Sequence, residues 1–270
     1  MLWERLEILL MPRLLVFRRA SMRRGRHGDS PARSEPVDQA QTSADWGGAV
    51  AVLGKVLARE ARRGTRVEIA VSDLWVRSHL MPATSSSLSE QEMLLLARTH
   101  FTRQYPESGQ DNWTFRLALQ GAHLLAAGME SGLMQAIKEI SASAGARLSR
   151  VEPLFSWAYD RFEKALRDTS GWMLLDEPGM LTLAFVEQGR LISLHCQRCA
   201  GDDQDEVAAR LLERQSALLA QQSAEVRVFS VEGRPIRLPA PWRVALQQRI
   251  FNFDDPAGLA PVAAPLSRQH

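Results

Sequence analysis

The sequence predicts an α/β protein, because short apolar strands and amphipathic helices alternate along most of its length. The strongest signal lies at 170–196, where two tight turns separate three short apolar runs and a helix follows. The first turn is Asp176-Glu177-Pro178-Gly179, in which proline fixes φ and glycine accepts an unusual backbone angle. With 270 residues, the chain is long enough for two modest domains with their own cores.

The composition is that of a globular protein without a disulfide framework. Apolar residues make up 45% of the chain and charged residues 24%, which is ordinary for soluble domains. Two cysteines are too few for a disulfide scaffold, and no run of about 18 apolar residues predicts a membrane span. The N-terminus lacks the small-residue cleavage site of a secretory signal. We therefore expect a cytoplasmic protein.

Residues 11–28 are rich in arginine and contain no acidic residue. Such a block suits phosphates or an anionic membrane surface, so we expect peripheral association with the inner membrane; the alternative is a solvated basic tail. Without the block the chain is mildly acidic, which argues against a nucleic-acid-binding protein. The arginines concerned are Arg13, Arg18, Arg19, Arg23, Arg24 and Arg26.

The N-terminal elements begin with a hairpin. Leu6–Leu10 and Leu14–Arg18 are its strands, and Met11-Pro12-Arg13 is its turn. Residues 20–45 are polar, have no apolar periodicity and are predicted to be a flexible excursion. A helix follows over Trp46–Arg63, because its apolar residues recur on one helical face.

A second hairpin is predicted next, with strands Thr65–Val71 and Leu74–Met81 and the turn Ser72-Asp73. Ser89-Glu90-Gln91-Glu92 then forms a capping box, which opens a helix that ends near Gln104. The expected buried face of this helix comprises Met93, Leu96, Ala97, His100 and Phe101.

A third strand pair, Asn112–Leu119 with His123–Gly128, precedes a helix over Ser131–Ala144. Arg147–Val151 is a short strand, and Pro153 is expected to open a helix that extends to Leu166.

After the strands of 170–196 we expect a helix over Asp205–Gln221, a strand over Ala224–Val231 and a short helix over Trp242–Ile250. Units of a strand pair plus a helix recur in both halves, which indicates two related subdomains. The first hairpin of subdomain 1 is expected at 1–19, the flexible excursion at 20–45 and the remainder of subdomain 1 at 46–151. Subdomain 2 is expected at 152–252 and a disordered tail at 253–270.

Four segments carry a resemblance to a known family. They are VEIAVSDLWVRSHLMP with SEQEMLLLARTHF, NWTFRLALQ and HLLAAGM with SGLMQAIKEISASAG, GARLSRVEPLFSWAYDRFEKAL, and GWMLLDEPGMLTLAFVEQGRLISLHC. In this order they resemble the actin-like PilM family of type IV pilus assembly and the cytoplasmic domain of the GspL family of type II secretion. The resemblance covers about residues 5–235. It implies an actin-like (ribonuclease H-like) fold of two subdomains with mixed sheets.

The resemblance also implies a site for ATP, and that site looks degenerate here. In actin-like ATPases two hairpin turns face each other across a cleft, and each offers an aspartate for Mg²⁺ and small residues for phosphates. Asp176, Gly179 and Thr182 partly match the second turn. The first turn, 11–13, contains neither aspartate nor glycine, and 230–234 holds one glycine where a glycine-rich adenosine loop is expected. We therefore expect a pseudo-ATPase that needs no cofactor; a plain hairpin turn is the alternative reading.

Three other features of the sequence bear on function. Cys196 and Cys199 form a CxxC beside His195, but a second ligand pair for zinc is missing from the sequence, so their role stays open and no metal site is expected. Leu74-Trp75-Val76 reads as an exposed hairpin edge that would take an added strand or a tail peptide. The proline-bracketed segment 238–242 would suit docking in a groove.

Together these features predict a bacterial, cytoplasmic, non-enzymatic scaffold. By resemblance, it would sit under a membrane-embedded pilus or secretion platform and bind the cytoplasmic tail of an inner-membrane partner. The main alternative is an ATP-binding enzyme or kinase of the same fold. A third reading is an α/β binding module unrelated to actin.

Overall fold

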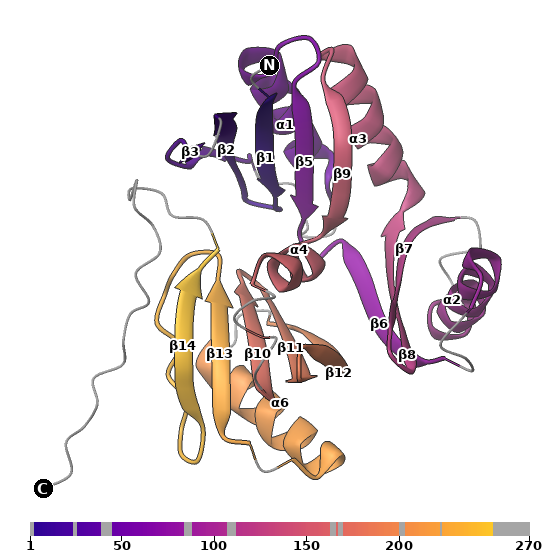
Figure 1. Cartoon of the computed structure of the whole chain (residues 1–270), viewed down its shortest axis with the longest axis vertical. Helices are drawn as coiled ribbons and strands as arrows, with labels where there is room; N and C mark the ends of the chain where they lie inside the picture. The colour runs from indigo at the N-terminus through magenta and orange to yellow at the C-terminus, as the bar shows by residue number, and fades with distance from the viewer. Residues whose placement is uncertain are drawn as a thin grey trace, which may run out of the picture. The chain divides into compact units, whose positions relative to one another are not determined.

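The computed structural model divides the chain into two compact units, one up to Trp157 and one from Ala158 to Phe251 (Figure 1). The sequence placed the boundary near residue 152. The structure describes residues 3–23, 26–38, 45–83, 88–106, 112–162, 166, 170–199, 203–221 and 223–250. The predicted tail, 253–270, lies outside the described residues.

Unit 1 is built on a mixed sheet in the order β3-β2-β1-β5-β9, with β4 also paired to β2. β1 is antiparallel to β2 and parallel to β5, which is parallel to β9. The strands are β1 (Trp3–Leu10), β2 (Leu14–Arg23), β3 (Arg26–Asp29), β4 (Arg33–Pro36), β5 (Arg66–Val71) and β9 (Arg147–Pro153). The first predicted hairpin is therefore confirmed.

Two neighbouring helices, α1 (Gly47–Glu60) and α3 (Ser131–Ser143), pack on this sheet (Figure 1). The apolar face predicted for α1 is buried against the sheet, and Leu133 and Ile137 of α3 join it. These helices and β5 form the core of unit 1 because their apolar stripes have no other surface to cover.

The predicted flexible excursion at 20–45 is wrong in part, because it contains β3 and β4. Both strands pair with β2, and the Val37 N–H donates to the Arg13 carbonyl at 3.0 Å. The side chains of β4 are mostly exposed, so this strand shows no apolar alternation that the sequence could reveal. Residues 39–44 of the excursion lie outside the described residues.

The predicted second hairpin is wrong, because β5 and β6 (Val76–Pro82) belong to different sheets. β5 already has a parallel neighbour on each side, β1 and β9, so no edge remains for a hairpin partner. Its last three residues, 69–71, are all buried. Consecutive buried residues are typical of a central parallel strand rather than of a half-exposed hairpin strand.

The second sheet of unit 1 is small, with the order β6-β8-β7. Its other strands are β7 (Trp113–Gln120) and β8 (His123–Glu130), which form the third predicted strand pair. α2 (Glu90–Gln104) covers it and begins with the predicted capping box. The Glu92 N–H donates to Ser89 Oγ, and Glu92 Oε2 accepts from the Ser89 N–H at 2.8 Å.

An aromatic cluster forms the core beneath α2. The Phe101 ring lies 4.8 Å from that of Phe115, 5.4 Å from that of Trp113 and 5.2 Å from that of His79, measured between centroids. Phe101 also lies against Gly128, where an added Cβ would be 2.5 Å from the ring. A side chain larger than hydrogen therefore does not fit at position 128 without moving the ring.

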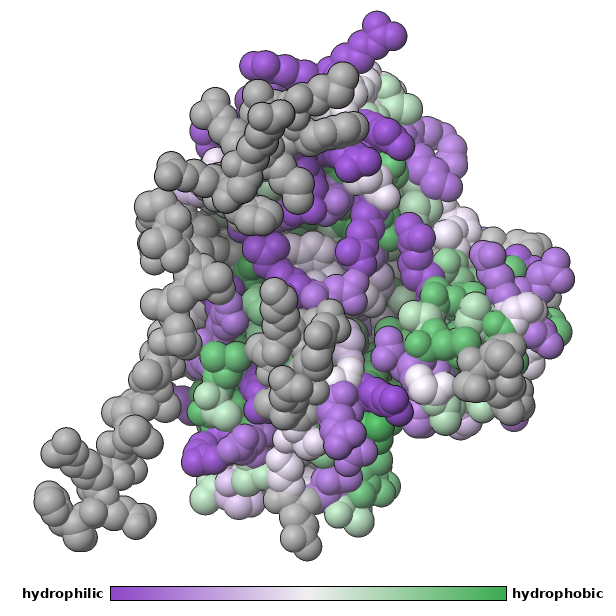
Figure 2. All heavy atoms as spheres, viewed as in Figure 1, coloured by the Kyte–Doolittle hydropathy of each residue, from purple (hydrophilic) through white to green (hydrophobic). Residues whose placement is uncertain are grey.

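α2 buries less of its apolar surface than the sequence predicted. Only Ala97 and Phe101 of the five expected residues are fully buried, and Leu95 is 67% exposed. Figure 2 shows hydrophobic residues at the surface of the lobe that contains α2. The helix thus presents apolar side chains on two sides, one facing the small sheet and one facing outward.

His79 in this cluster makes the stability of the small sheet depend on pH. Its Nε2 lies 2.8 Å from the Tyr105 hydroxyl, and its ring centroid lies 4.8 Å from that of His100. Burial, followed by the charges of His100 and Arg77, lowers the pKa of His79 to about 4. In the folded protein the ring therefore stays neutral where an unfolded histidine binds a proton.

We expect the small sheet to lose roughly 2 kcal/mol of stability as the pH falls from about 6.5 to about 4. In this window the unfolded chain binds a proton that the folded chain does not, so acid favours unfolding. The magnitude is reduced here for solvent screening, since the ring is only partly buried. Hydrogen exchange of β6 and β8 amides at both pH values measures it. His79→Gln should weaken the pH dependence, His123→Gln should keep it, and equal behaviour of the two variants would contradict the assignment.

Unit 2 has one sheet in the order β12-β11-β10-β13-β14. The antiparallel strands β10 to β12 are the predicted meander, and β13 is parallel to both β10 and β14. The strands are β10 (Ser170–Glu177), β11 (Met180–Glu187), β12 (Arg190–Arg198), β13 (Glu225–Ser230) and β14 (Arg243–Arg249). α6 (Gln204–Leu219) packs on one face, against Trp172 and Leu183 among others.

Two predicted helices differ in the structure. The segment Trp242–Ile250 is not a helix but contains β14, because its apolar residues also fit a two-residue period and β13 offers a free edge. Pro153 ends β9, and α4 (Leu154–Arg161) begins one residue later. Residues 163–165, which the sequence assigned to that helix, lie outside the described residues.

The two units repeat one topology. In unit 1, β1 and β2 form a hairpin, α1 follows, and β5 returns parallel to β1. In unit 2, β10 to β12 form a meander, α6 follows, and β13 returns parallel to β10. This agrees with the sequence indication of two related halves.

Candidate functional site

Asp176, the aspartate of the predicted nucleotide site, lies at the end of β10 and is 3% exposed. It lies opposite Ser230 of the parallel strand β13, and Ser230 Oγ donates a hydrogen bond to Asp176 Oδ2 at 3.0 Å. Arg234, four residues later, donates from Nη2 to Asp176 Oδ1 at 3.3 Å, and its Nε lies 3.3 Å from Oδ2. The carboxylate is therefore engaged by the chain itself.

Arg234 is held in turn by α6. Its Nη1 donates to Asp205 Oδ1 at 2.8 Å, so one guanidinium joins β10 to the first turn of α6. Gly233, with φ of +75°, lets the chain turn after β13, and its N–H donates to Ser230 Oγ at 3.0 Å. Asp176, Ser230, Arg234 and Asp205 thus form one network, with Asp176 and Ser230 buried and Arg234 and Asp205 partly exposed; we call it the Asp176 network.

Burial raises the pKa of Asp176, and the opposing effects of Arg234 and Ser230 do not fully cancel it. For Arg234, burial lowers the pKa, but the bonds to Asp205 and Asp176 outweigh it, so the net shift is upward. The guanidinium is therefore a permanent cation beside a carboxylate that has lost its water. Such a carboxylate depends on Arg234 for its counter-charge.

The other two predicted site residues do not join this network. Gly179 occupies the turn between β10 and β11 with φ of +84°, and its carbonyl accepts from the Cys199 N–H at 3.0 Å. Thr182 is buried opposite Leu175, whereas Asp176 is opposite Leu181. Because successive residues of a strand point to opposite faces, Thr182 and Asp176 lie on opposite faces of the sheet.

Sequence reasoning missed Arg234 and Asp205, which lie 58 and 29 residues from Asp176. The segment 230–234 was assessed for missing glycines only. The one local signal was an arginine directly after a glycine at the end of a predicted strand, and that pattern has many other meanings.

The first turn offers no acidic counterpart in unit 1. Pro12 and Arg13 occupy the bend between β1 and β2, and Arg13 is exposed. A buried aspartate does follow β5: Asp73 Oδ2 accepts from the Phe155 N–H at 3.1 Å, at the start of α4. Sequence reasoning had assigned Asp73 to a hairpin turn, so its role at a helix start was missed.

Leu74-Trp75-Val76 is not an exposed partner edge. The three residues are 6%, 7% and 3% exposed, and Trp75 and Val76 belong to the core of unit 1. β6 is an edge strand of the small sheet, but the large side chains at its start point into that core. The prediction that these residues form an exposed edge is therefore wrong.

The arginine block is partly committed to internal ion pairs. Arg18 Nη2 lies 2.6 Å from Glu7 Oε2, and the Arg18 side chain is 11% exposed. Arg19 donates to the Glu60 carbonyl at 2.7 Å. Arg18 is therefore held within the chain, whereas the Arg19 side chain is still 38% exposed, so membrane association of the block stays a prediction. Arg13 is exposed, Arg24 lies outside the described residues, and the side chains of Arg23 and Arg26 are outside them too.

Cys196 and Cys199 are not in a disulfide. Cys196 is exposed near the end of β12, and Cys199 is buried. Within the described ranges, no three histidine, cysteine or acidic side chains converge as metal ligands. No helix in the described part of the chain has the length and apolar character needed to cross a membrane.

Leu238 and Trp242 of the proline-bracketed segment pack on the core of unit 2.

No family model and no curated protein matches the sequence, but solved structures match the fold. A chain of a PilM–PilN type IV pilus biogenesis complex has a TM-score of 0.64 at 14% identity, covering 84% of this chain and 81% of that one. A Bacteroides thetaiotaomicron protein with an actin-like ATPase fold and unknown function has a TM-score of 0.60 at 14% identity, with coverage of 85% and 82%.

The cytoplasmic domain of EpsL, an inner membrane component of the type II secretion system of Vibrio cholerae, is also similar. Its TM-score is 0.52 at 10% identity, with coverage of 88% of this chain and 87% of that domain. The chain therefore has the actin-like fold, and the predicted fold class is confirmed.

Proposed function

We propose that this chain is a non-enzymatic, actin-like scaffold of a pilus or secretion assembly platform, which binds the cytoplasmic tail of an inner-membrane partner. The fold-level similarity to the PilM–PilN complex and to EpsL supports the scaffold role. The observation that carries the non-enzymatic part is the Asp176 network. In it, Arg234 forms an ion pair with Asp176, the aspartate that a nucleotide site would need.

The physical argument concerns charge. An aspartate that supports Mg²⁺ in such a site must be open to the hydrated ion. Here the carboxylate is buried under Arg234 and Ser230, and the guanidinium would repel a divalent cation at close range. Residues of the described second unit therefore do not fit the Mg²⁺–nucleotide group that the fold implies.

Calorimetric titration of the chain with Mg²⁺ and ATP tests the non-enzymatic part. We expect no saturable heat with either wild type or Asp176→Asn. Mg²⁺-dependent binding that Asp176→Asn abolishes would favour the ATP-binding enzyme instead.

The scaffold part needs a separate test. A tagged chain expressed with its genomic neighbours should co-purify an inner-membrane protein, and removing that protein's cytoplasmic tail should abolish co-purification. Retention of the partner without its tail would contradict the proposed tail-binding role.

A further inference from the structure

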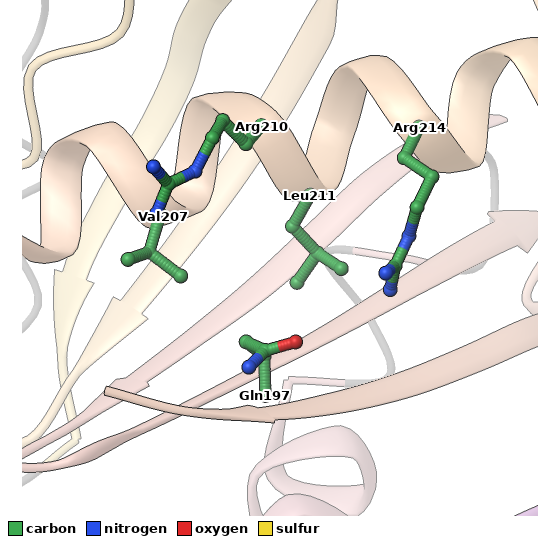
Figure 3. A pocket seen from close by; sticks show the side chains of 5 residues that line it. All are labelled: Gln197, Val207, Arg210, Leu211 and Arg214. Carbon is green, nitrogen blue, oxygen red and sulfur yellow. The ribbon is translucent and has the colours of Figure 1, made fainter. Parts of the chain in front are cut away.

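A cavity of about 320 Å³ opens between α6 and β12 in unit 2. Val207 and Leu211 supply its apolar part, and Arg210, Arg214 and Gln197 supply its polar part. Figure 3 shows Val207, Leu211 and Arg214 projecting from α6 toward Gln197 on the strand. The five residues come from two elements that the sequence placed correctly, yet the nucleotide argument used none of them.

The lining residues Val207, Leu211 and Arg214 lie on one face of α6. Positions 207, 211, 214 and 218 follow one another at intervals of four, three and four, so they lie along one face of the helix. Val207 and Leu211 are buried at the sheet, whereas Leu218 at the end of the same face is 71% exposed. A large apolar side chain exposed to water one helical turn beyond Arg214 suits a ligand that also has apolar groups.

On the strand side the cavity is lined by the polar Gln197. Gln197 and His195 of β12 are two residues apart and so share a face, which is the face of their partners Leu181 and Leu183 in the core under α6. Ser193, on that same face, is 7% exposed, and its Oγ has no hydrogen-bond partner within the described part of the chain. β12 is also the edge strand of its sheet.

The charge of the cavity is positive. Arg210 forms one exposed pair with Glu206 at 3.0 Å, and Arg214 is exposed. The charge of Arg214 also reaches His195 of β12. Burial, followed by the Arg214 charge, lowers the pKa of His195. Two guanidinium groups one turn apart beside an amide are suited to carboxylates.

We propose that this groove, formed by Val207, Arg210, Leu211, Arg214 and Gln197, binds an acidic segment of a partner protein that carries an aliphatic side chain between carboxylates. The aliphatic side chain would contact the small part of Val207 and Leu211 that lines the cavity, and the carboxylates would pair with Arg210 and Arg214. The complementarity of charge, and the exposed Leu218 one helical turn beyond Arg214, favour this occupant over a basic or purely polar one. The proposal goes beyond the scaffold role and does not depend on it.

The test uses three labelled hexapeptides with the full chain and fluorescence anisotropy. One peptide has two leucines between two pairs of glutamates, the second replaces the leucines with serines, and the third replaces the glutamates with lysines. We expect the first to bind most tightly and to weaken as salt is raised. Arg214→Glu should weaken it at least tenfold, and Arg210→Glu should do the same.

Arg190→Glu is the matched control, because it makes the same charge change far from the groove. Arg190 is on β12, the strand that carries Gln197, but lies seven residues or roughly 23 Å from it. It should leave the affinity within about twofold. All three arginines are exposed, so the variants should fold, and circular dichroism checks this. Equal loss in the Arg190 variant, equal binding of the lysine peptide, or no binding of the first peptide would overturn the proposal. So would selective binding of inorganic phosphate or ATP at Arg214 without the peptide.

Discussion

Replacing Arg234 with alanine is expected to lower the free energy of unfolding of unit 2 by about 2–3 kcal/mol at pH 7. The substitution removes the counter-charge of Asp176, which is 3% exposed and keeps only its bond from Ser230. Breaking a buried ion pair from one side costs about 3–5 kcal/mol. The Arg234 side chain is 29% exposed. Solvent screening therefore reduces the expected loss to the lower end of that range or below it. Urea unfolding followed by tryptophan fluorescence measures it.

The effect of Arg234→Ala should shrink as the pH falls. Burial already raises the pKa of Asp176, and removal of the guanidinium raises it further. Once Asp176 is protonated, it no longer needs a counter-charge, so the variant recovers relative to wild type in acid.

A double variant separates charge from packing. Asp176→Asn with Arg234→Ala should recover more than half of the loss, because no buried charge remains. Arg210→Ala removes an exposed pair with Glu206 and should cost less than about 0.5 kcal/mol. If Arg234→Ala costs no more than Arg210→Ala, the Asp176 network is not a stabilising ion pair.

Replacing Phe101 with alanine is expected to lower the stability of the small sheet by about 4 kcal/mol. Phe101 of α2 is 1% exposed and packs on all three strands, against His79 of β6, Trp113 and Phe115 of β7 and Gly128 of β8. Phenylalanine-to-alanine changes in cores cost about 3–5 kcal/mol. The site cannot collapse easily, because Gly128 opposite the ring has no side chain to fill the space.

Hydrogen exchange of the β7 and β8 amides measures this loss directly. Leu95→Ala on the same helix is the matched control, since Leu95 is 67% exposed and should cost less than about 0.5 kcal/mol. Unchanged protection of β8 in the Phe101 variant would show that the aromatic cluster does not hold the small sheet together.

Elements with strong local signals could be predicted from the sequence. The capping box at Ser89, the tight turn at Pro178-Gly179 and the apolar face of α1 are each encoded within a few residues, and the structure contains all three. Sheet membership could not be predicted in the same way. β5 and β6 are adjacent in sequence but pair with strands far along the chain, and no local pattern records those partners.

The candidate site shows the same division. Asp176 was identified because its turn is local, whereas Arg234 was missed because the pairing of β10 with β13 brings it near. Thr182 was grouped with Asp176 by sequence distance, yet strand alternation places it on the other face. Burial at Leu74 and Trp75 depends on the packing of the whole unit 1 core, which a short apolar run does not reveal.

The position of the small sheet in the chain has an evolutionary consequence. The main sheet of unit 1 ends one strand at Val71 and begins the next at Arg147, and β6 to β8 with α2 and α3 lie between them. Unit 2 joins its corresponding strands, β13 and β14, through residues 231–242 alone. The part of the inserted segment outside the unit 1 core, which includes Trp75, Val76, Ala127 and Met129, can therefore change in length and surface without altering the order of the parallel strands on either side of it.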